Sequence, residues 1–305
     1  MGVDGGGTRT RVALVDGAGR ECARAEGPPT LIDPADPKAT MGVIVDLCRE
    51  VAATGGAELP VEGLWAGIAG AGTEPMRGVV ETALGEAGLS SRTSVGADAE
   101  ATFHDAFPSG PGILLISGTG SIALARGADG SRVRVGGWGR HLGDEGSGYR
   151  IGTAALRALA RGEDGRGVPT KLRDPLLEAL GVAGPPELIK WTATARKADV
   201  AALVPLICKV AEAGDQAATT VIEKAVDELV EHVRTLVRRL EPWPATPEVA
   251  LAGGLIEEAG PLRLRVIPAI EGLPCRYRDR APDGARGACA LAMSLVDKTD
   301  GTPVP

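Results

Sequence analysis

The chain has 305 residues, enough for two domains with separate hydrophobic cores, and carries a formal net charge of −7. This charge, without any lysine- or arginine-rich block, argues against nucleic acid or an anionic membrane surface as a partner. No apolar run approaches the ~20 residues of a membrane span, and the sequence enters a strand at once without a signal peptide, so we expect a cytoplasmic protein.

The first half predicts three meandering strands, over 1–4, 11–16 and 21–25, followed by alternating helices and strands. The expected later elements are a helix over 37–53, a strand over 63–70, a helix over 75–87, a strand over 93–96 and a helix over 99–107. The clearest linker is Pro108–Gly112, so we predict an N-terminal domain over 1–111 and a C-terminal domain over 112–305.

The second half repeats this order, starting with strands over 112–116, 122–125 and 132–135. The remaining expectations are helices from residue 149, over 171–180, 200–213 and 215–240, a strand over 249–252 followed by a helix, and a last helix over 285–296. The tail over 299–305 is expected to be disordered. Both halves therefore predict a mixed α/β fold rather than a uniform βαβ array.

Two short glycine-rich turns join strands, one in each half, and are the first candidates for a ligand site. The first comprises Gly5, Gly6, Gly7 and Thr8, and the second comprises Gly118, Thr119, Gly120 and Ser121. Glycine N–H groups can close on an anion, and the two threonine hydroxyls can contact phosphate oxygens. The pair suggests a duplicated fold with phosphates held between the copies; the alternative is two simple hairpin turns.

Two aspartates follow predicted strands. Asp4 precedes the first turn and can hold Mg²⁺ through water, because Mg²⁺ prefers oxygen ligands and keeps several waters; capping the turn is the alternative. Asp98 lies at a strand-to-helix junction, where aspartate is a good N-cap. It can also accept a hydroxyl proton, and such a base contributes ~10²–10⁴-fold to a rate.

The glycine-rich loop over 136–148 contains Trp138, Asp144 and Glu145 and opens a helix. Asp144 can accept hydrogen bonds from sugar hydroxyls, or it can cap the helix. Gly253 and Gly254 follow a predicted strand and would let a nucleoside approach the backbone. The sequence lacks a Walker A motif, a Gly-x-Ser-x-Gly elbow and a dinucleotide-binding fingerprint, which disfavours P-loop, hydrolase and Rossmann functions.

Six segments occur in a characteristic order. They are Val3–Thr8, Asp98-Ala99, Ser117–Ser121, Gly136–Gly139, Gly143–Ser147 and Ala252–Gly254. Together, over nearly the whole chain, they resemble the N-acetylglucosamine kinase branch of the BadF/BadG/BcrA/BcrD ATPase family, within the actin/hexokinase/Hsp70 superfamily.

This resemblance implies two RNase H-like domains flanking a nucleotide-binding cleft, with ATP and Mg²⁺ bound between the hairpins. It implies an ATP-dependent kinase that phosphorylates an amino sugar, N-acetylglucosamine or glucosamine, at the 6-hydroxyl. Asp98 would be the catalytic base, and the residues of the sugar pocket would be Thr119, Gly120, Gly137, Trp138 and Asp144. The resemblance also implies a homodimer and a last helix, within 285–297, that returns to the first domain.

Two departures from the family pattern qualify the expected substrate. Thr30 stands where the family has a sugar-contacting asparagine, so the requirement for an N-acetyl group is left open. The dehydratase activators of the family carry cluster cysteines near the central hairpin, but here none lies between Cys48 and Cys208. The alternative function is a nucleotide-switched ATPase activator or sensor of the same family without sugar transfer.

Overall fold

The computed structural model describes residues 1–32, 36 and 40–297, and the chain divides into two compact units. The first unit contains Met1–Ser109 together with the chain from Pro282 onward, and the second contains Gly110–Ala281. The division after Ser109 lies inside the segment expected as a linker. The second unit ends at Ala281 rather than at the C-terminus, because the last helix packs on the first unit.

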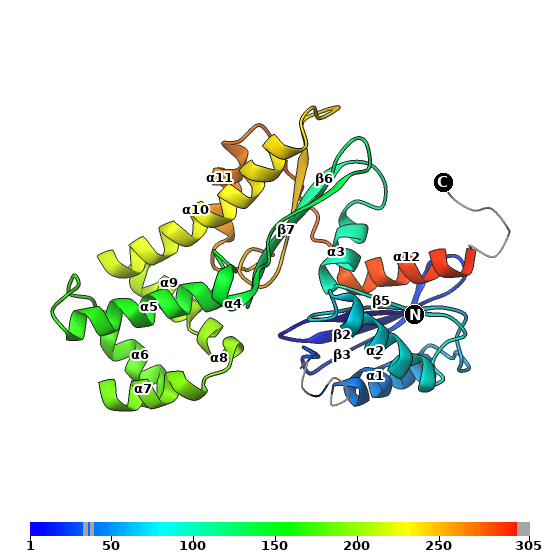
Figure 1. Ribbon diagram of the computed structural model, residues 1–305, viewed down its shortest axis with the longest axis horizontal. Coiled ribbons are helices and arrows are strands. Elements are labelled where there is room, and N and C mark those ends of the chain that lie inside the picture. Colours follow the sequence, from blue (N-terminus) through cyan, green and yellow to red (C-terminus); the bar gives the residue numbers. More distant parts are fainter. Residues whose placement is uncertain (33–35, 37–39, 298–305) are drawn as a thin grey trace. The chain divides into compact units, whose positions relative to one another are not determined.

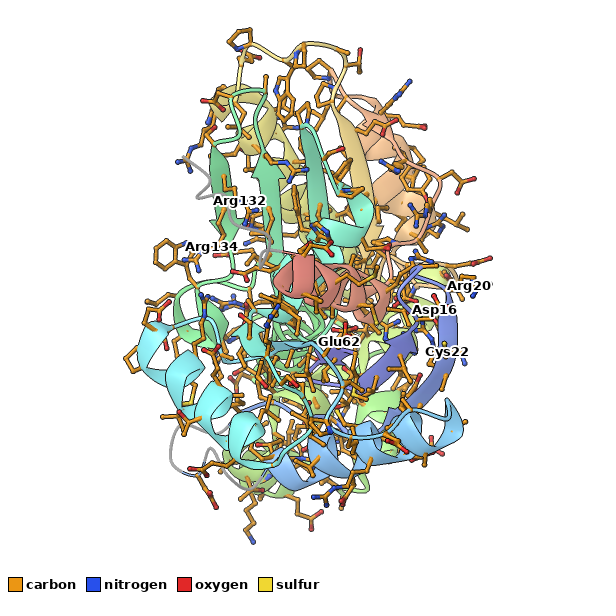
Figure 2. The ribbon with its side chains drawn as sticks, turned by 90° about the vertical axis from the view of Figure 1, so that its right-hand side faces the viewer. Asp16, Arg20, Cys22, Glu62, Arg132 and Arg134 are labelled. Carbon is orange, nitrogen blue, oxygen red and sulfur yellow. The ribbon has the colours of Figure 1, made fainter. Side chains whose placement is uncertain are left out.

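The first unit is built on a five-stranded sheet of order β3-β2-β1-β4-β5. Its strands are β1 (Gly2–Gly5), β2 (Thr10–Val15), β3 (Glu21–Gly27), β4 (Leu64–Ile68) and β5 (Thr93–Gly96). The first three are antiparallel neighbours, whereas β4 and β5 run parallel to β1. In the β1–β2 hairpin Asp4 lies opposite Arg11. The turn between β2 and β3 is held by Asp16 and Arg20, whose side chains form a hydrogen bond of 2.9 Å (Figure 2).

The second unit repeats this sheet with the order β10-β9-β6-β7-β8. Its strands are β6 (Gly112–Ser117), β7 (Ser121–Arg126), β8 (Arg132–Gly136), β9 (Glu248–Ala252) and β10 (Arg276–Tyr277). Again three strands form an antiparallel meander and two run parallel to its first strand. The edge strand β8 carries the exposed side chains of Arg132 and Arg134 (Figure 2). The duplicated α/β fold expected from the sequence is therefore present.

Helices cover both faces of the first sheet. They are α1 (Met41–Thr54), α2 (Glu74–Glu86), α3 (Asp98–Ala106) and α12 (Gly284–Asp297). Alternate residues of a strand face opposite sides, so Val3 and Val12 pack in a core with α1 and α2, while Ala13 packs against α12. Figure 1 shows α12 lying beside α3. Residues 37–39 of the helix expected over 37–53, and the tail over 299–305, lie outside the described residues.

Glycines allow α12 to lie very close to its neighbours. A Cβ atom at Gly287 would lie 1.9 Å from the carbonyl oxygen of Ala101 in α3, and one at Gly2 would lie 2.3 Å from the backbone nitrogen of Cys289. The N-terminus of α12 is also fixed by charge, since Arg286 donates to the buried carboxylate of Asp105. These contacts attach α12 to the first unit.

The second unit contains the remaining helices of the described chain. They are α4 (Gly139–Leu142), α5 (Gly148–Glu163), α6 (Arg173–Leu180), α7 (Pro185–Thr194), α8 (Lys197–Ala201), α9 (Val204–Glu212), α10 (Gln216–Arg239) and α11 (Arg263–Glu271). The helix predicted over 200–213 is confirmed as α9, but its start is wrong, because residues 200 and 201 belong to α8. Pro205 lies in the first turn of α9, where its missing N–H costs nothing. The helices α4 and α7 and the short strand β10 were not predicted.

The long helix α10 supplies one side of the core of this unit. Its buried stripe, which includes Ile222, Leu229 and Val233, packs with Ile113 and Leu115 of β6. In the part of the chain that the structure describes, no helix combines the length and the apolarity needed to cross a membrane.

Candidate functional site

The first glycine turn is closed by a hydrogen bond from the Gly6 N–H to the Arg9 carbonyl, at 3.0 Å. A Cβ atom on Gly7 would have no atom within 4 Å, so the outer part of the turn faces open space. Gly5 is buried instead, and a Cβ there would lie 2.4 Å from the Thr30 hydroxyl. Thr8 is exposed at the end of the turn. This geometry leaves the Gly6–Thr8 backbone accessible to a ligand.

Thr30 lies inside the first unit, behind this turn. Its side chain has no exposed surface, and its hydroxyl lies 2.8 Å from the Thr10 hydroxyl, which also donates to the Pro28 carbonyl. The Thr30 N–H donates to the Gly6 carbonyl at 3.2 Å. The residue therefore braces the turn, and a contact between Thr30 and a sugar, as the sequence predicts, would require it to become exposed.

Asp4 is buried and paired with Arg11, the residue opposite it in the hairpin. The Arg11 Nη2 and Nε atoms donate to Asp4 Oδ2 at 2.6 and 3.2 Å. Burial raises the pKa of Asp4, and the guanidinium of Arg11 opposes that rise only in part. A Cβ at Gly284 would lie 2.5 Å from the Asp4 carboxylate, so glycine makes room for it. The register of a short hairpin could have identified Arg11, which the sequence analysis missed.

The donor set around Asp4 suits Mg²⁺ that keeps most of its waters. Both hydrogen bonds from Arg11 end on Oδ2, and no described residue donates to Oδ1. Within the described ranges no group of three or more histidine, cysteine or acidic side chains could form a protein-only metal cage. A single carboxylate combined with water and phosphate oxygens is the usual way for proteins to hold Mg²⁺. Asp4 therefore fits a water-mediated contact.

Asp98 is the first residue of α3 and is not its N-cap, a position taken by Ala97. The Asp98 Oδ1 atom accepts a hydrogen bond from the Ala99 N–H at 2.9 Å. Burial, and then the negative charge of Asp4, raise the pKa of Asp98 to about 6. Gly67 of β4 makes room for the residue, because a Cβ there would lie 3.1 Å from the Asp98 Cα. The first unit thus brings two coupled carboxylates together at the ends of β1 and β5.

In the second unit, the central turn is attached to the loop that precedes α5. The two serines that flank it donate into this loop, Ser117 to the Gly146 carbonyl at 2.9 Å and Ser121 to the Glu145 carbonyl at 2.6 Å. The Gly148 N–H in turn donates to the Gly118 carbonyl at 2.8 Å. The Ser121 hydroxyl is therefore engaged in supporting the loop, while Gly118, Thr119 and Gly120 remain partly exposed.

Gly253 and Gly254 lie beside this turn. Gly253 has φ of 90°, and a Cβ there would lie 2.5 Å from the Ser117 carbonyl oxygen. A Cβ on Gly118 would lie 3.8 Å from the Gly254 nitrogen, and one on Gly254 would meet no atom within 4 Å. The second unit therefore brings two glycine segments, about 135 residues apart in sequence, to one place with open space beside them.

Gly136, the last residue of β8, and Gly137, which follows it, both have φ in the left-handed region. A Cβ at Gly136 would lie 2.5 Å from the ring of the buried His232, and one at Gly137 would lie 2.7 Å from Ile122. His232 is thus a packing residue, and burial lowers its pKa. The Trp138 side chain is 64% exposed and carries the Arg134 guanidinium 4.9 Å from its ring centroid.

Asp144 is the most constrained residue of this loop. It is 4% exposed and has φ of 61°, which is unusual for a residue other than glycine. It does not cap α5, because Ser147 is the N-cap and accepts from the Arg150 N–H. Lys197 of α8 donates from Nζ to Asp144 Oδ2 at 2.5 Å. No local pattern in the sequence points to Lys197, which is 53 residues away.

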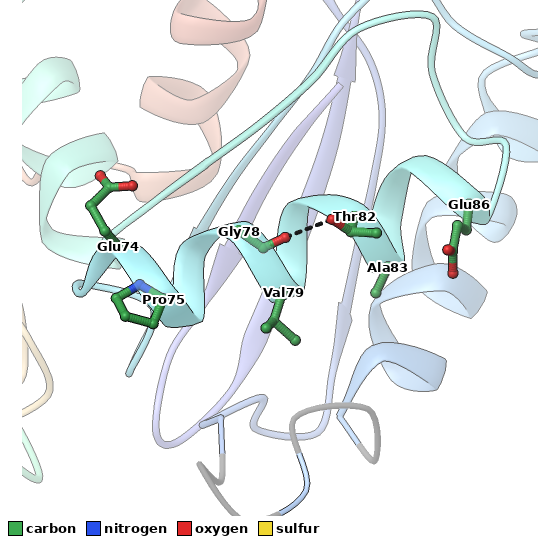
Figure 3. A pocket seen from close by; sticks show the side chains of 7 residues that line it. All are labelled: Glu74, Pro75, Gly78, Val79, Thr82, Ala83 and Glu86. Carbon is green, nitrogen blue, oxygen red and sulfur yellow. Dashed lines mark hydrogen bonds between the residues drawn. The ribbon is translucent and has the colours of Figure 1, made fainter.

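A separate open groove of about 560 Å³ runs along α2 in the first unit (Figure 3). One face of the helix lines it, with Pro75, Gly78 and Val79 among the lining residues and Glu74 and Glu86 at the ends. It contains none of the residues predicted to bind ATP, Mg²⁺ or sugar.

Comparisons with known proteins identify relatives of the chain. Residues 1–273 match the model of the BadF/BadG/BcrA/BcrD ATPase family. The chain is similar to an N-acetylmuramic acid/N-acetylglucosamine kinase of Clostridium acetobutylicum, with 29% identity over 97% of this chain and 99% of that protein. It is also similar to an N-acetyl-D-glucosamine kinase of Dictyostelium discoideum, with 31% identity over 96% of this chain and 97% of that protein.

Among solved structures, a Chromobacterium violaceum protein with a provisional assignment as an N-acetylglucosamine kinase is 28% identical, covering 95% of this chain and 97% of that one, with a TM-score of 0.82. This chain, with its two five-stranded sheets of corresponding strand order, therefore shares its overall fold with that structure. Fold, glycine turns and sequence thus agree that the chain belongs to the BadF/BadG/BcrA/BcrD ATPase family.

Proposed function

We propose that the protein is an ATP-dependent sugar kinase that transfers a phosphoryl group to a hydroxyl of an amino sugar. Two relatives that the chain matches over nearly their whole length are named as kinases of N-acetylated amino sugars. The acceptor proposed first is N-acetylglucosamine at its 6-hydroxyl. Glucosamine is the second candidate, because Thr30 stands where the family has an asparagine.

The observation that carries the proposal is the state of Asp98. A kinase base must be ionised at working pH and yet basic enough to take a proton from a hydroxyl, so a pKa near the operating pH is the best compromise. Burial and the nearby charge of Asp4 raise the pKa of Asp98 to about 6. In the proposed step the sugar hydroxyl oxygen attacks the γ-phosphorus of ATP and its proton passes to the Asp98 carboxylate. The bond between the γ-phosphorus and the oxygen that bridges it to the β-phosphorus breaks, and ADP leaves.

The two glycine turns are the proposed phosphate contacts. The Gly6 and Gly118 N–H groups close the turns by donating to the Arg9 and Gly120 carbonyls. The other N–H groups of the two turns would neutralise charge on the phosphoryl oxygens. Gly253 and Gly254 would accept the nucleoside side of ATP. When bound, Mg²⁺ supplies charge neutralisation at the phosphates, and Asp4 is the residue that would hold it through water.

The proposed sugar contacts come from the second unit. Asp144 would accept hydrogen bonds from sugar hydroxyls, with Thr119, Gly120, Gly137 and Trp138 shaping the pocket. The constrained backbone of Asp144 supports this role, since strained residues at well-braced positions are common in functional sites. A homodimer is the proposed assembly.

Replacement of Asp98 by asparagine tests the assignment. Asp98→Asn keeps the shape of the side chain but removes its basicity, so sugar phosphorylation should fall by ~10²–10⁴-fold while ATP affinity stays within a factor of about two. Asp46→Asn, at an exposed position on α1, is the matched control and should behave like the unchanged protein. Normal turnover by Asp98→Asn would exclude the proposed role.

A further inference from the structure

A lysine ammonium lies beside the central turn in the second unit, next to the carboxylate proposed to bind sugar. The Lys197 Nζ atom lies 2.5 Å from Asp144 Oδ2, and the two side chains are 27% and 5% exposed. A Cβ on Gly120 would lie 3.1 Å from Lys197 Nζ and 3.3 Å from Asp144 Oδ1. Donor and acceptor therefore both adjoin the residue that the sequence predicts at the edge of the sugar pocket.

The backbone that carries Lys197 is tightly held. The helix α8 packs on the start of α5 through two glycines, because a Cβ at Gly148 would lie 2.9 Å from the Ala201 Cβ and one at Gly152 would lie 2.3 Å from the Val200 carbonyl oxygen. A side chain at either glycine would therefore overlap α8. The position of the lysine is thus set by packing between helices rather than by a mobile surface loop.

The ion pair leaves half of the carboxylate for another partner. Lys197 contacts Oδ2, whereas Oδ1 faces the space beside Gly120. Burying a charged carboxylate to this extent without a cationic partner would cost free energy. Without that partner the side chain could also turn to another rotamer. A fixed carboxylate with one open oxygen is a suitable acceptor for a sugar hydroxyl, because a preorganised site loses less entropy on binding.

We propose that Lys197 is a positioning residue of the sugar site, which acts by holding Asp144 in the orientation that accepts sugar hydroxyls. This inference rests on the proposed function, in which Asp144 contacts the sugar. Its consequence is specific: loss of the ammonium weakens sugar binding and leaves ATP binding alone.

Steady-state kinetics with N-acetylglucosamine and ATP test the inference. Lys197→Met removes the charge at similar length, and we expect the KM for sugar to rise at least about tenfold, with the KM for ATP and kcat changed by less than about threefold. Lys197→Arg retains a cation that can pair with Asp144 and should recover most of the sugar affinity. Lys190→Met, at an exposed position on α7, is the matched control.

The outcomes separate this inference from the proposed function. An unchanged KM for sugar in Lys197→Met would overturn the positioning role while leaving the kinase assignment intact. Equal increases in both KM values would also overturn it, because they would indicate a general structural effect. If the unchanged protein phosphorylates no sugar, the proposed function fails and this inference fails with it. Should Lys197→Met not fold, Lys197→Gln, which keeps a donor without the charge, provides the same comparison.

Discussion

At the scale of single residues, the candidate site is defined by what each carboxylate has beside it. Asp4 has a guanidinium, Asp144 has an ammonium, and Asp98 has backbone N–H groups and the negative charge of Asp4. Burial and the negative charge of Asp4 raise the pKa of Asp98 to about 6. The carboxylate proposed to move a proton therefore lies in surroundings that favour its protonated state.

This environment predicts an acid limit to activity. Because the pKa of Asp98 is raised to about 6, the carboxylate is ionised and able to accept a proton above that pH, and it is protonated and inactive below it. We expect kcat/KM for sugar to fall as the pH decreases through about 6, approaching one decade per pH unit. The measurement is a pH–rate profile between pH 5 and 8 at saturating ATP. A profile that stays flat down to pH 5 would contradict the role of Asp98.

Residue identities predicted the glycine turns and their aspartates but not the pairs formed across long sequence separations. The turns could be predicted because few residue types permit such backbone conformations. The role of Lys197 could not be predicted, because its partner is 53 residues away and its position depends on how α8 packs on α5. The burial of Thr30 behind Gly5 could not be predicted either, since it depends on the Thr10–Thr30 contact.

At the scale of elements, the strands were predicted better than the helices of the second unit. Both meanders follow from short apolar runs separated by turn residues. The break between α8 and α9 falls at Ala202 and Leu203, where the apolar periodicity continues. Only Pro205, in the first turn of α9, marks the boundary in the sequence. The helix α7 was missed because its buried surface is small, with Leu188 as its one buried residue.

Two glycine-to-alanine substitutions test how closely α12 packs. In Gly287→Ala the new methyl group would overlap the Ala101 carbonyl, so backbone must shift, and we expect a loss of at least about 2 kcal/mol in the free energy of unfolding. Gly78→Ala places the same methyl group on the open face of α2, where nothing lies within 4 Å (Figure 3). It should stabilise the protein by about 0.5–1 kcal/mol, since alanine favours a helix interior over glycine.

Urea unfolding followed by circular dichroism compares these two variants directly. The comparison depends on the opposite signs of the two changes in the free energy of unfolding, because the covalent change is identical in both variants. Similar effects of the two substitutions would mean that α12 does not lie against α3 as closely as the structure indicates.

At the scale of the whole molecule, the chain contains one sheet topology twice, with the two strand orders in direct correspondence. Each copy has a glycine turn after the first strand of its meander and a carboxylate close to that turn or its loop. The last helix returns to the first unit, which makes that unit discontinuous in sequence. The duplication could be predicted because both halves repeat the same order of elements, whereas the return of α12 was implied only by the family resemblance.

The central claim, that this protein is a sugar kinase, is tested most directly by ADP release from ATP with and without a panel of hexoses. We predict that ADP forms only when an acceptor sugar is present, with N-acetylglucosamine or glucosamine the best acceptor, and that Asp98→Asn abolishes this sugar-dependent signal. ADP release at the same rate with every sugar and with none would instead identify a sugar-independent ATPase and contradict the account.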